Sequence, residues 1–208
     1  ATGAELLQHM HRDAALEKEL VLDAAFFHAL ARDVPELGGI QSLCKRGGYD
    51  NELGKFRYDV TLQVGPAPAQ AEPTRLDWLT DALDADRLVS HLKSTDATCV
   101  EVRNIPNARV AAEVRLHALI HNGAAQKPLH EALATAAEAL PAAMDPEDYH
   151  QNAERHGLHA RVRHAPGHPD RIEALFWRPD TAPPADPAPT GTTAQRDHAK
   201  APLAPVRF

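Results

Sequence analysis

An alternating run of side chains, residues 56–64, constrains the fold of this chain more than any other feature. Apolar and polar residues alternate along it, so the two kinds would point to opposite faces of a strand. The apolar residues are Phe56, Tyr58, Val60 and Leu62, and the polar residues are Arg57, Asp59, Thr61 and Gln63. A period of two is typical of a β-strand with unlike faces. A second β-type run, residues 40–44, precedes it, and glycine, asparagine and aspartate between the runs favour turns. We predict an antiparallel hairpin with a connection of about ten residues, a length typical of functional loops.

The rest of the chain alternates between helical and β-type patterns. Before the hairpin, apolar spacing predicts helices at about 4–19 and 24–32, the second capped by Asp23. After it we expect one or two short helices within 76–92 and a strand at 98–103. Helices should follow at about 107–122 and 129–140, and another should run from Asp145-Pro146 to Gly157. The last expected element is a hairpin of 159–164 with 171–177.

Composition shifts suggest how these elements are grouped. Residues 1–64 form one segment, and residues 65–74 form a Pro/Ala linker. Residues 75–178 form a small α+β lobe, and residues 179–208 form a flexible Pro/Ala-rich tail.

Charge and composition exclude several classes of protein. The 208 residues carry a net charge of −7, which argues against nucleic acid as a partner. No apolar run approaches the roughly 20 residues that span a bilayer, and the first residues do not resemble a secretory leader. Two cysteines are too few for a disulfide framework. We therefore expect a cytoplasmic protein with reduced thiols and no membrane partner.

Three segments, in order, resemble the methyltransferase domains embedded in non-ribosomal peptide synthetases. The hairpin region carries the most specific of them, KRG at 45–47, DNEL at 50–53 and FRYDV at 56–60. The other two are ELVLDAAFF at 19–27 and NIPNAR at 104–109. The resemblance runs discontinuously from about residue 20 to residue 177.

The resemblance implies an α/β fold and an assembly-line activity. Residues 1–64 would supply the closing helix and antiparallel hairpin of a class I methyltransferase-like sheet, with the small α+β lobe appended. The complete domain would use S-adenosylmethionine to methylate an aminoacyl group tethered to a carrier protein. The implied partners are that carrier protein and adjacent synthase domains, in particular the adenylation domain.

The chain does not contain the glycine-rich loop and following acid that hold the donor in class I enzymes. The family's first strands are expected before residue 1. This chain alone should therefore bind no cofactor, and methyl transfer would need the missing part. Three interpretations remain open. The chain is part of a methyltransferase domain, or it is a natural remnant kept as a structural or docking module, or it shares only the fold and has an unrelated function.

Three residues are candidates for catalysis. In the resembled family the hairpin loop faces the substrate entrance, so Asn51 and Glu52 are placed to orient or deprotonate an amine; the alternative is a turn-supporting Asn51 and a solvated Glu52. Tyr58 is the third candidate, and its alternative role is a core ring with its hydroxyl at an edge.

Three cations near the same hairpin are candidates for substrate binding. Lys45 and Arg46, next to glycines, suit the phosphate of a phosphopantetheine arm, although a solvated turn is the alternative. Arg57 is the third, and it is also placed to pair with Asp59 or another acidic neighbour.

Other chemistry has weaker support in the sequence. His117 and His121 are four residues apart on a predicted helix, a spacing that can chelate, but no complete ligand motif is present, so we predict no metal site. Cys44 precedes two cations, yet nothing in the sequence indicates a Cys–His nucleophile pair.

Overall fold

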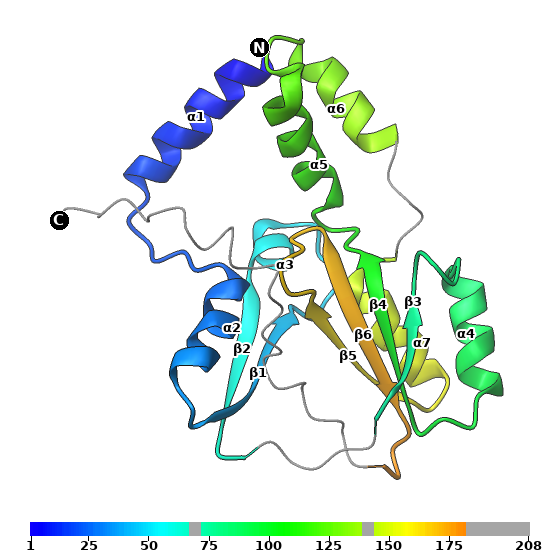
Figure 1. Cartoon of the computed structure of the whole chain (residues 1–208). Coiled ribbons are helices and arrows are strands. Elements are labelled where there is room, and N and C mark those ends of the chain that lie inside the picture. The colour runs from blue at the N-terminus through cyan, green and yellow to red at the C-terminus, as the bar shows by residue number, and fades with distance from the viewer. Residues whose placement is uncertain (67–71, 139–143, 182–208) are drawn as a thin grey trace.

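A computed structural model of the chain describes residues 1–66, 72–138 and 144–181. These residues contain six strands and seven α-helices (Figure 1). The strands are β1 Leu37–Cys44, β2 Tyr58–Val64, β3 Thr74–Asp77, β4 Cys99–Pro106, β5 His159–His164 and β6 Arg171–Trp177. The helices are α1 Gly3–Leu16, α2 Ala24–Asp33, α3 Glu52–Phe56, α4 Ala85–Ser94, α5 Ala111–Leu119, α6 Leu129–Glu138 and α7 Pro146–Arg155. Three parts of the assignment lie outside the described residues: the expected tail from residue 182 on, the middle of the linker and the end of the helix at 129–140.

All six strands form one open sheet in the order β2-β1-β5-β6-β4-β3. Both predicted hairpins are confirmed: β1 pairs antiparallel with β2, and β5 with β6. The contact between Leu43 and Arg163 joins the two hairpins, so residues 1–64 and 75–178 share a sheet. The mixed α/β class is confirmed, whereas the likeness to class I methyltransferases and the division at residues 65–74 stay predictions.

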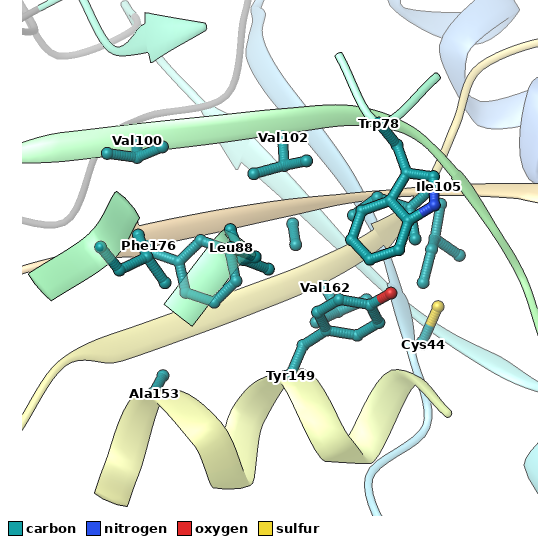
Figure 2. Close-up of a cluster of buried hydrophobic side chains, with 13 residues drawn as sticks. Cys44, Trp78, Leu88, Val100, Val102, Ile105, Tyr149, Ala153, Val162 and Phe176 are labelled. Atoms are coloured by element: carbon teal, nitrogen blue, oxygen red, sulfur yellow. The ribbon is translucent and has the colours of Figure 1, made fainter. Parts of the chain in front are cut away.

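The hydrophobic core lies between one face of this sheet and helices α4 and α7. Figure 2 shows Tyr149 and Ala153 of α7 pointing toward strand residues Val102 and Val162. Leu88 and Leu92 of α4 belong to the same cluster. The list of its members is Cys44, Trp78, Leu88, Leu92, Val100, Val102, Ile105, Tyr149, Ala153, Val162, Ile172, Ala174 and Phe176. Alternation along each strand places charged residues on the opposite face, called the polar face below.

Capping residues set the starts of several helices. Thr2 and Asp145 each form a capping box with α1 and α7, and Asp23 accepts from the backbone of α2 as predicted. An N-cap of this kind is worth about 1 kcal/mol because it gives a partner to an otherwise unpaired N–H group. Gly157 has φ +67 just after α7, which confirms the predicted stop.

Two parts of the sequence-based assignment are wrong. Residues 76–77, expected at the start of a helix, belong to strand β3 (Thr74–Asp77), where Leu76 pairs in parallel with Val102. The helix α4 begins only after its cap Asp84. Phe56 ends the short helix α3 instead of starting the strand, since Asn51 caps a helical turn before it.

Helices α1, α5 and α6 extend away from the sheet (Figure 1). α1 meets α6 and the π-helical turn Ile120–Ala124 near its N-terminus, where Gly3 packs on Ile120. Leu16, the last residue of α1, is mostly exposed.

Candidate functional site

The loop between β1 and β2, residues 45–57, carries five of the six candidate residues and is called the hairpin loop here. It contains α3, whose N-cap Asn51 accepts a hydrogen bond from the Gly54 amide at 2.8 Å. Gly47 has φ +100, a conformation that side chains disfavour. A Cβ at Gly54 would lie 2.7 Å from the carbonyl oxygen of Tyr49. The path of this loop is therefore closely defined by its glycines and its cap.

Arg109 lies beneath the hairpin loop and donates five hydrogen bonds. Its Nη1 donates to the carbonyls of Lys45 at 2.7 Å and Gly54 at 3.0 Å, and its Nη2 donates to the carbonyl of Gly47 at 2.6 Å. Nε and Nη2 also reach the two carboxylate oxygens of Asp145, at 2.9 and 2.7 Å. These bonds use all five donors of a guanidinium. We call this arrangement the Arg109 site.

The Arg109 site is buried, and its charges depend on one another. Only 5% of the Arg109 side chain is exposed. The hydrogen bond to Asp145 is the main reason why the pKa of Arg109 is raised. Burial raises the pKa of the nearby Cys44 thiol to about 12, against the opposing effect of the Arg109 charge. Cys44 is therefore a protonated core residue at neutral pH.

A second anchor of the hairpin loop is Glu147, in the first turn of α7. Its Oε2 accepts from Arg46 Nε at 2.8 Å and from the Gly47 amide at 2.7 Å, while its Oε1 accepts from Arg46 Nη2 at 2.9 Å. The Arg46 hydrogen bond, with the Gly47 amide as a further cause, lowers the pKa of Glu147 to about 2. The loop is thus attached to α7 as well as to Arg109.

The three catalytic candidates have different surroundings. The side-chain oxygen of Asn51 caps α3 by accepting from the Gly54 amide, which agrees with the alternative of a turn-supporting Asn51. Glu52 is exposed in the first turn of that helix. Tyr58 is half-buried, donates its hydroxyl to the Leu22 carbonyl and packs edge-on against His164. Burial is the main reason why the pKa of Tyr58 is raised.

Each of the three substrate-binding candidates is ion-paired within the chain. Lys45 binds Asp59, and Arg46 binds Glu147 together with Glu154. Arg57 binds Glu19 at 3.0 Å, so its partner is an acidic residue of the segment before α2. Binding of an anionic ligand here would compete with these acids.

Sequence reasoning missed Arg109 as a functional residue, although it belongs to the NIPNAR segment. Its partners Lys45, Gly47 and Gly54 lie more than fifty positions away, and they use backbone carbonyls that no side-chain pattern reveals. Asp145 was predicted only as a helix cap; it fulfils that role and also binds Arg109.

The polar face carries a separate set of ion pairs, called the Glu101 network. Glu101 accepts from Arg163 at 2.7 Å through one oxygen, and from Arg75 and Arg103 at 3.1 and 3.0 Å through the other. Arg163 also binds Glu173 at 2.8 Å. The Glu101 side chain is 4% exposed, so a buried carboxylate balances several cations here.

In the parts of the chain that the structure describes, no group of three or more His, Cys, Asp or Glu side chains is placed to hold a metal ion. The rings of His117 and His121 lie 4.0 Å apart. No helix in the same described ranges has both the length and the apolar character needed to cross a membrane.

Comparison with known proteins gives the chain its relatives. No family model matches it. Chondramide synthase of Chondromyces crocatus is 39% identical over 117 residues, which is 54% of this chain and 3% of the synthase. Cyclosporin synthetase of Tolypocladium inflatum is 31% identical over 118 residues, or 54% of this chain and 1% of that protein. A nonribosomal peptide synthetase of Penicillium thymicola is 35% identical over 121 residues, which is 54% of this chain and 4% of that protein.

The chain thus spans a few per cent, at most, of these much longer proteins. Half of the chain resembles them, which confirms the predicted likeness at that level. Over about half of its length, this chain is similar to segments of nonribosomal peptide synthetases.

Proposed function

We propose that this chain is the C-terminal part of a methyltransferase domain within a nonribosomal peptide synthetase. In this role it contributes to transfer of a methyl group from S-adenosylmethionine to an aminoacyl group on a carrier protein. The Arg109 site is the observation that carries the proposal. It joins the motif segments 45–47 and 104–109, which are far apart in sequence and which both resemble segments of such domains.

Methyl transfer is an in-line displacement, so the enzyme must hold the donor and align a neutral acceptor amine. Glu52 is exposed on the hairpin loop. We propose that its carboxylate meets the acceptor and accepts its proton. We propose Asn51 as a support for that turn and Tyr58 as a neighbouring hydroxyl that contacts the substrate. Lys45, Arg46 and Arg57 would each release the acidic side chain that they bind within the chain and would bind the phosphate of the carrier arm in its place.

The sheet order agrees with a donor site supplied by another part of a larger domain. β2 is the outermost strand next to β1, so one of its edges is unpaired within the described residues. An open edge is a ready template for a further strand. We propose that strands of the donor-binding part pair there, and that this chain has no tight S-adenosylmethionine site of its own.

Calorimetric titration tests whether the donor site lies in the preceding part of the domain. The chain alone should show no S-adenosylmethionine binding at micromolar concentrations, whereas a longer protein that includes the preceding synthase sequence should bind it. The longer protein should also transfer radiolabelled methyl groups to an aminoacyl carrier protein. Micromolar binding by the chain alone, or a longer protein that neither binds nor transfers, would contradict the proposal.

A second candidate function is a docking module without turnover. It is favoured by the exposed apolar side chains of Tyr49, Leu53 and Phe56 on the hairpin loop. A pull-down with the carrier protein and the adenylation domain of the same synthase separates the two functions. Capture of either domain together with absence of methyl transfer in the longer protein favours docking; methyl transfer favours the first function.

A further inference from the structure

The hairpin loop is fixed on its inner side and open on its outer side. Arg109 and Glu147 hold its backbone from within, through the carbonyls of Lys45, Gly47 and Gly54 and the amide of Gly47. On the outer side Tyr49, Leu53 and Phe56 are 75%, 62% and 55% exposed. Binding residues often lie on loops that a rigid scaffold holds in place, and these contacts give the hairpin loop such a support.

The geometry of these contacts requires a guanidinium. The carbonyls of Lys45 and Gly54 come from opposite ends of the loop and meet at Nη1, while the carbonyl of Gly47 meets Nη2. A planar fork with five donors can satisfy all three and still bind a carboxylate through two bonds. A lysine ammonium has three donors on one nitrogen, so it cannot bridge the same set of oxygens.

Asp145 adds a link that acts on Arg109 and leaves the loop itself untouched. It binds Arg109 through two oxygens and caps α7 through the Glu147 amide, at 2.8 Å. The orientation of the guanidinium is therefore set by the first turn of α7. A displacement of Arg109 would be transmitted to both ends of the hairpin loop.

We propose that Arg109 is a positioning residue, which holds the hairpin loop in one conformation so that Glu52, Leu53 and Phe56 meet the acceptor substrate. This inference rests on the proposed function, because it assigns the loop to acceptor binding. Arg109 itself touches neither substrate nor donor. It acts through the backbone of the loop.

Hydrogen exchange on this chain tests the positioning role without any assay of methylation. Arg109→Lys keeps the charge but loses the fork, so the amides of residues 45–57 should exchange roughly tenfold faster or more, while those of β4 and β6 keep their protection. Arg75→Lys in the Glu101 network is the matched control and should change neither set. Unchanged protection of the loop in Arg109→Lys would overturn the proposal.

A second variant covers the case in which Arg109→Lys does not fold. Asp145→Asn keeps a good helix cap but removes the charge that orients Arg109. Exchange of the hairpin loop should rise about threefold or more, while α7 keeps its protection. A loop that exchanges as in the wild type would again overturn the proposal.

The kinetic test uses the longer methyltransferase with its donor-binding part. Arg109→Lys should lower kcat for the carrier-bound acceptor roughly tenfold or more and leave the KM for S-adenosylmethionine unchanged, since only the acceptor side is displaced. Equal kcat in variant and wild type would refute the positioning role. Absence of transfer in the wild type would instead refute the proposed function, and the exchange result would stand by itself.

Discussion

The Arg109 site and the Glu101 network are both built around a buried charge, yet they do different work. Arg109 binds backbone carbonyls of a loop that lacks a regular hydrogen-bond ladder. Glu101 binds side chains of β3, β4 and β5, strands of one sheet whose positions backbone pairing already fixes. The comparison teaches that an ion pair matters most where it determines the path of the backbone.

The largest expected effect separates the two sites directly. Arg109→Ala would leave three carbonyls and the Asp145 carboxylate without their partner, and it should lower the free energy of unfolding by about 3–5 kcal/mol. Urea denaturation followed by circular dichroism measures this value. A loss below about 1 kcal/mol would mean that Arg109 determines the backbone no more than the Glu101 network does.

Adding one methyl group to the hairpin loop sharpens the same comparison. In Gly54→Ala the new Cβ would lie 2.7 Å from the Tyr49 carbonyl oxygen, a backbone atom that cannot move freely. We expect a loss of about 1–3 kcal/mol in urea denaturation. Gly48→Ala is the matched control, because its Cβ would meet nothing within 4 Å. Equal stability of the two variants would show that the loop path is loosely defined.

The second anchor should be recognisable by its pH dependence. The pKa of Glu147 is about 2 in the folded chain, below its ordinary value of 4.5. A carboxyl whose pKa is lowered on folding stabilises the fold above its unfolded pKa, and this stabilisation is lost as pH falls toward the folded pKa. Glu147→Gln should therefore be less stable than wild type by about 1–2 kcal/mol at neutral pH, with the difference shrinking between pH 4.5 and about 2.

Glu154→Gln is the control for that experiment, since Glu154 also binds Arg46 but is mostly exposed. Its effect should stay within about 0.5 kcal/mol at any pH. If both variants showed the same pH profile, either acidic partner of Arg46 would stabilise the fold equally. The buried position of Glu147 would then have no special effect.

The smallest effect is expected in the Glu101 network. Arg75→Ala removes a half-exposed partner of Glu101, whose remaining contacts with Arg103 and Arg163 stay in place. The loss should be below about 1 kcal/mol and should decrease further at high salt. A loss as large as that of Arg109→Ala would overturn the contrast between the two sites.

The elements with regular periodicity could be predicted from the sequence. Alternation gave the strand that begins near Tyr58, and the cap-proline-acid run at Asp145 gave the start of α7. β3 was missed because four residues of strand are too short to display a period, and Leu76 is also compatible with a helical spacing.

The candidate site was only partly accessible from the sequence. The hairpin loop could be found through its motif residues, but its internal contacts depend on carbonyl groups and on the distant Arg109. The ion pair between Arg57 and Glu19 was likewise invisible, since the two residues are brought together only when the segment before α2 folds against β2.

The pairing of β1 with β5 has a consequence for biosynthesis. The β1–β2 ribbon is complete at Val64, and the chain up to His164 must be made before all of β5 can join it. Synthesis of these 100 residues (164 − 64) takes roughly 5–20 s at 5–20 residues per second, and during this time the edge of β1 that later meets β5 is open. A two-stranded ribbon is marginally stable in water. Products terminated before His159 should therefore be cleared by cellular proteases, since the strand that seals the ribbon never emerges.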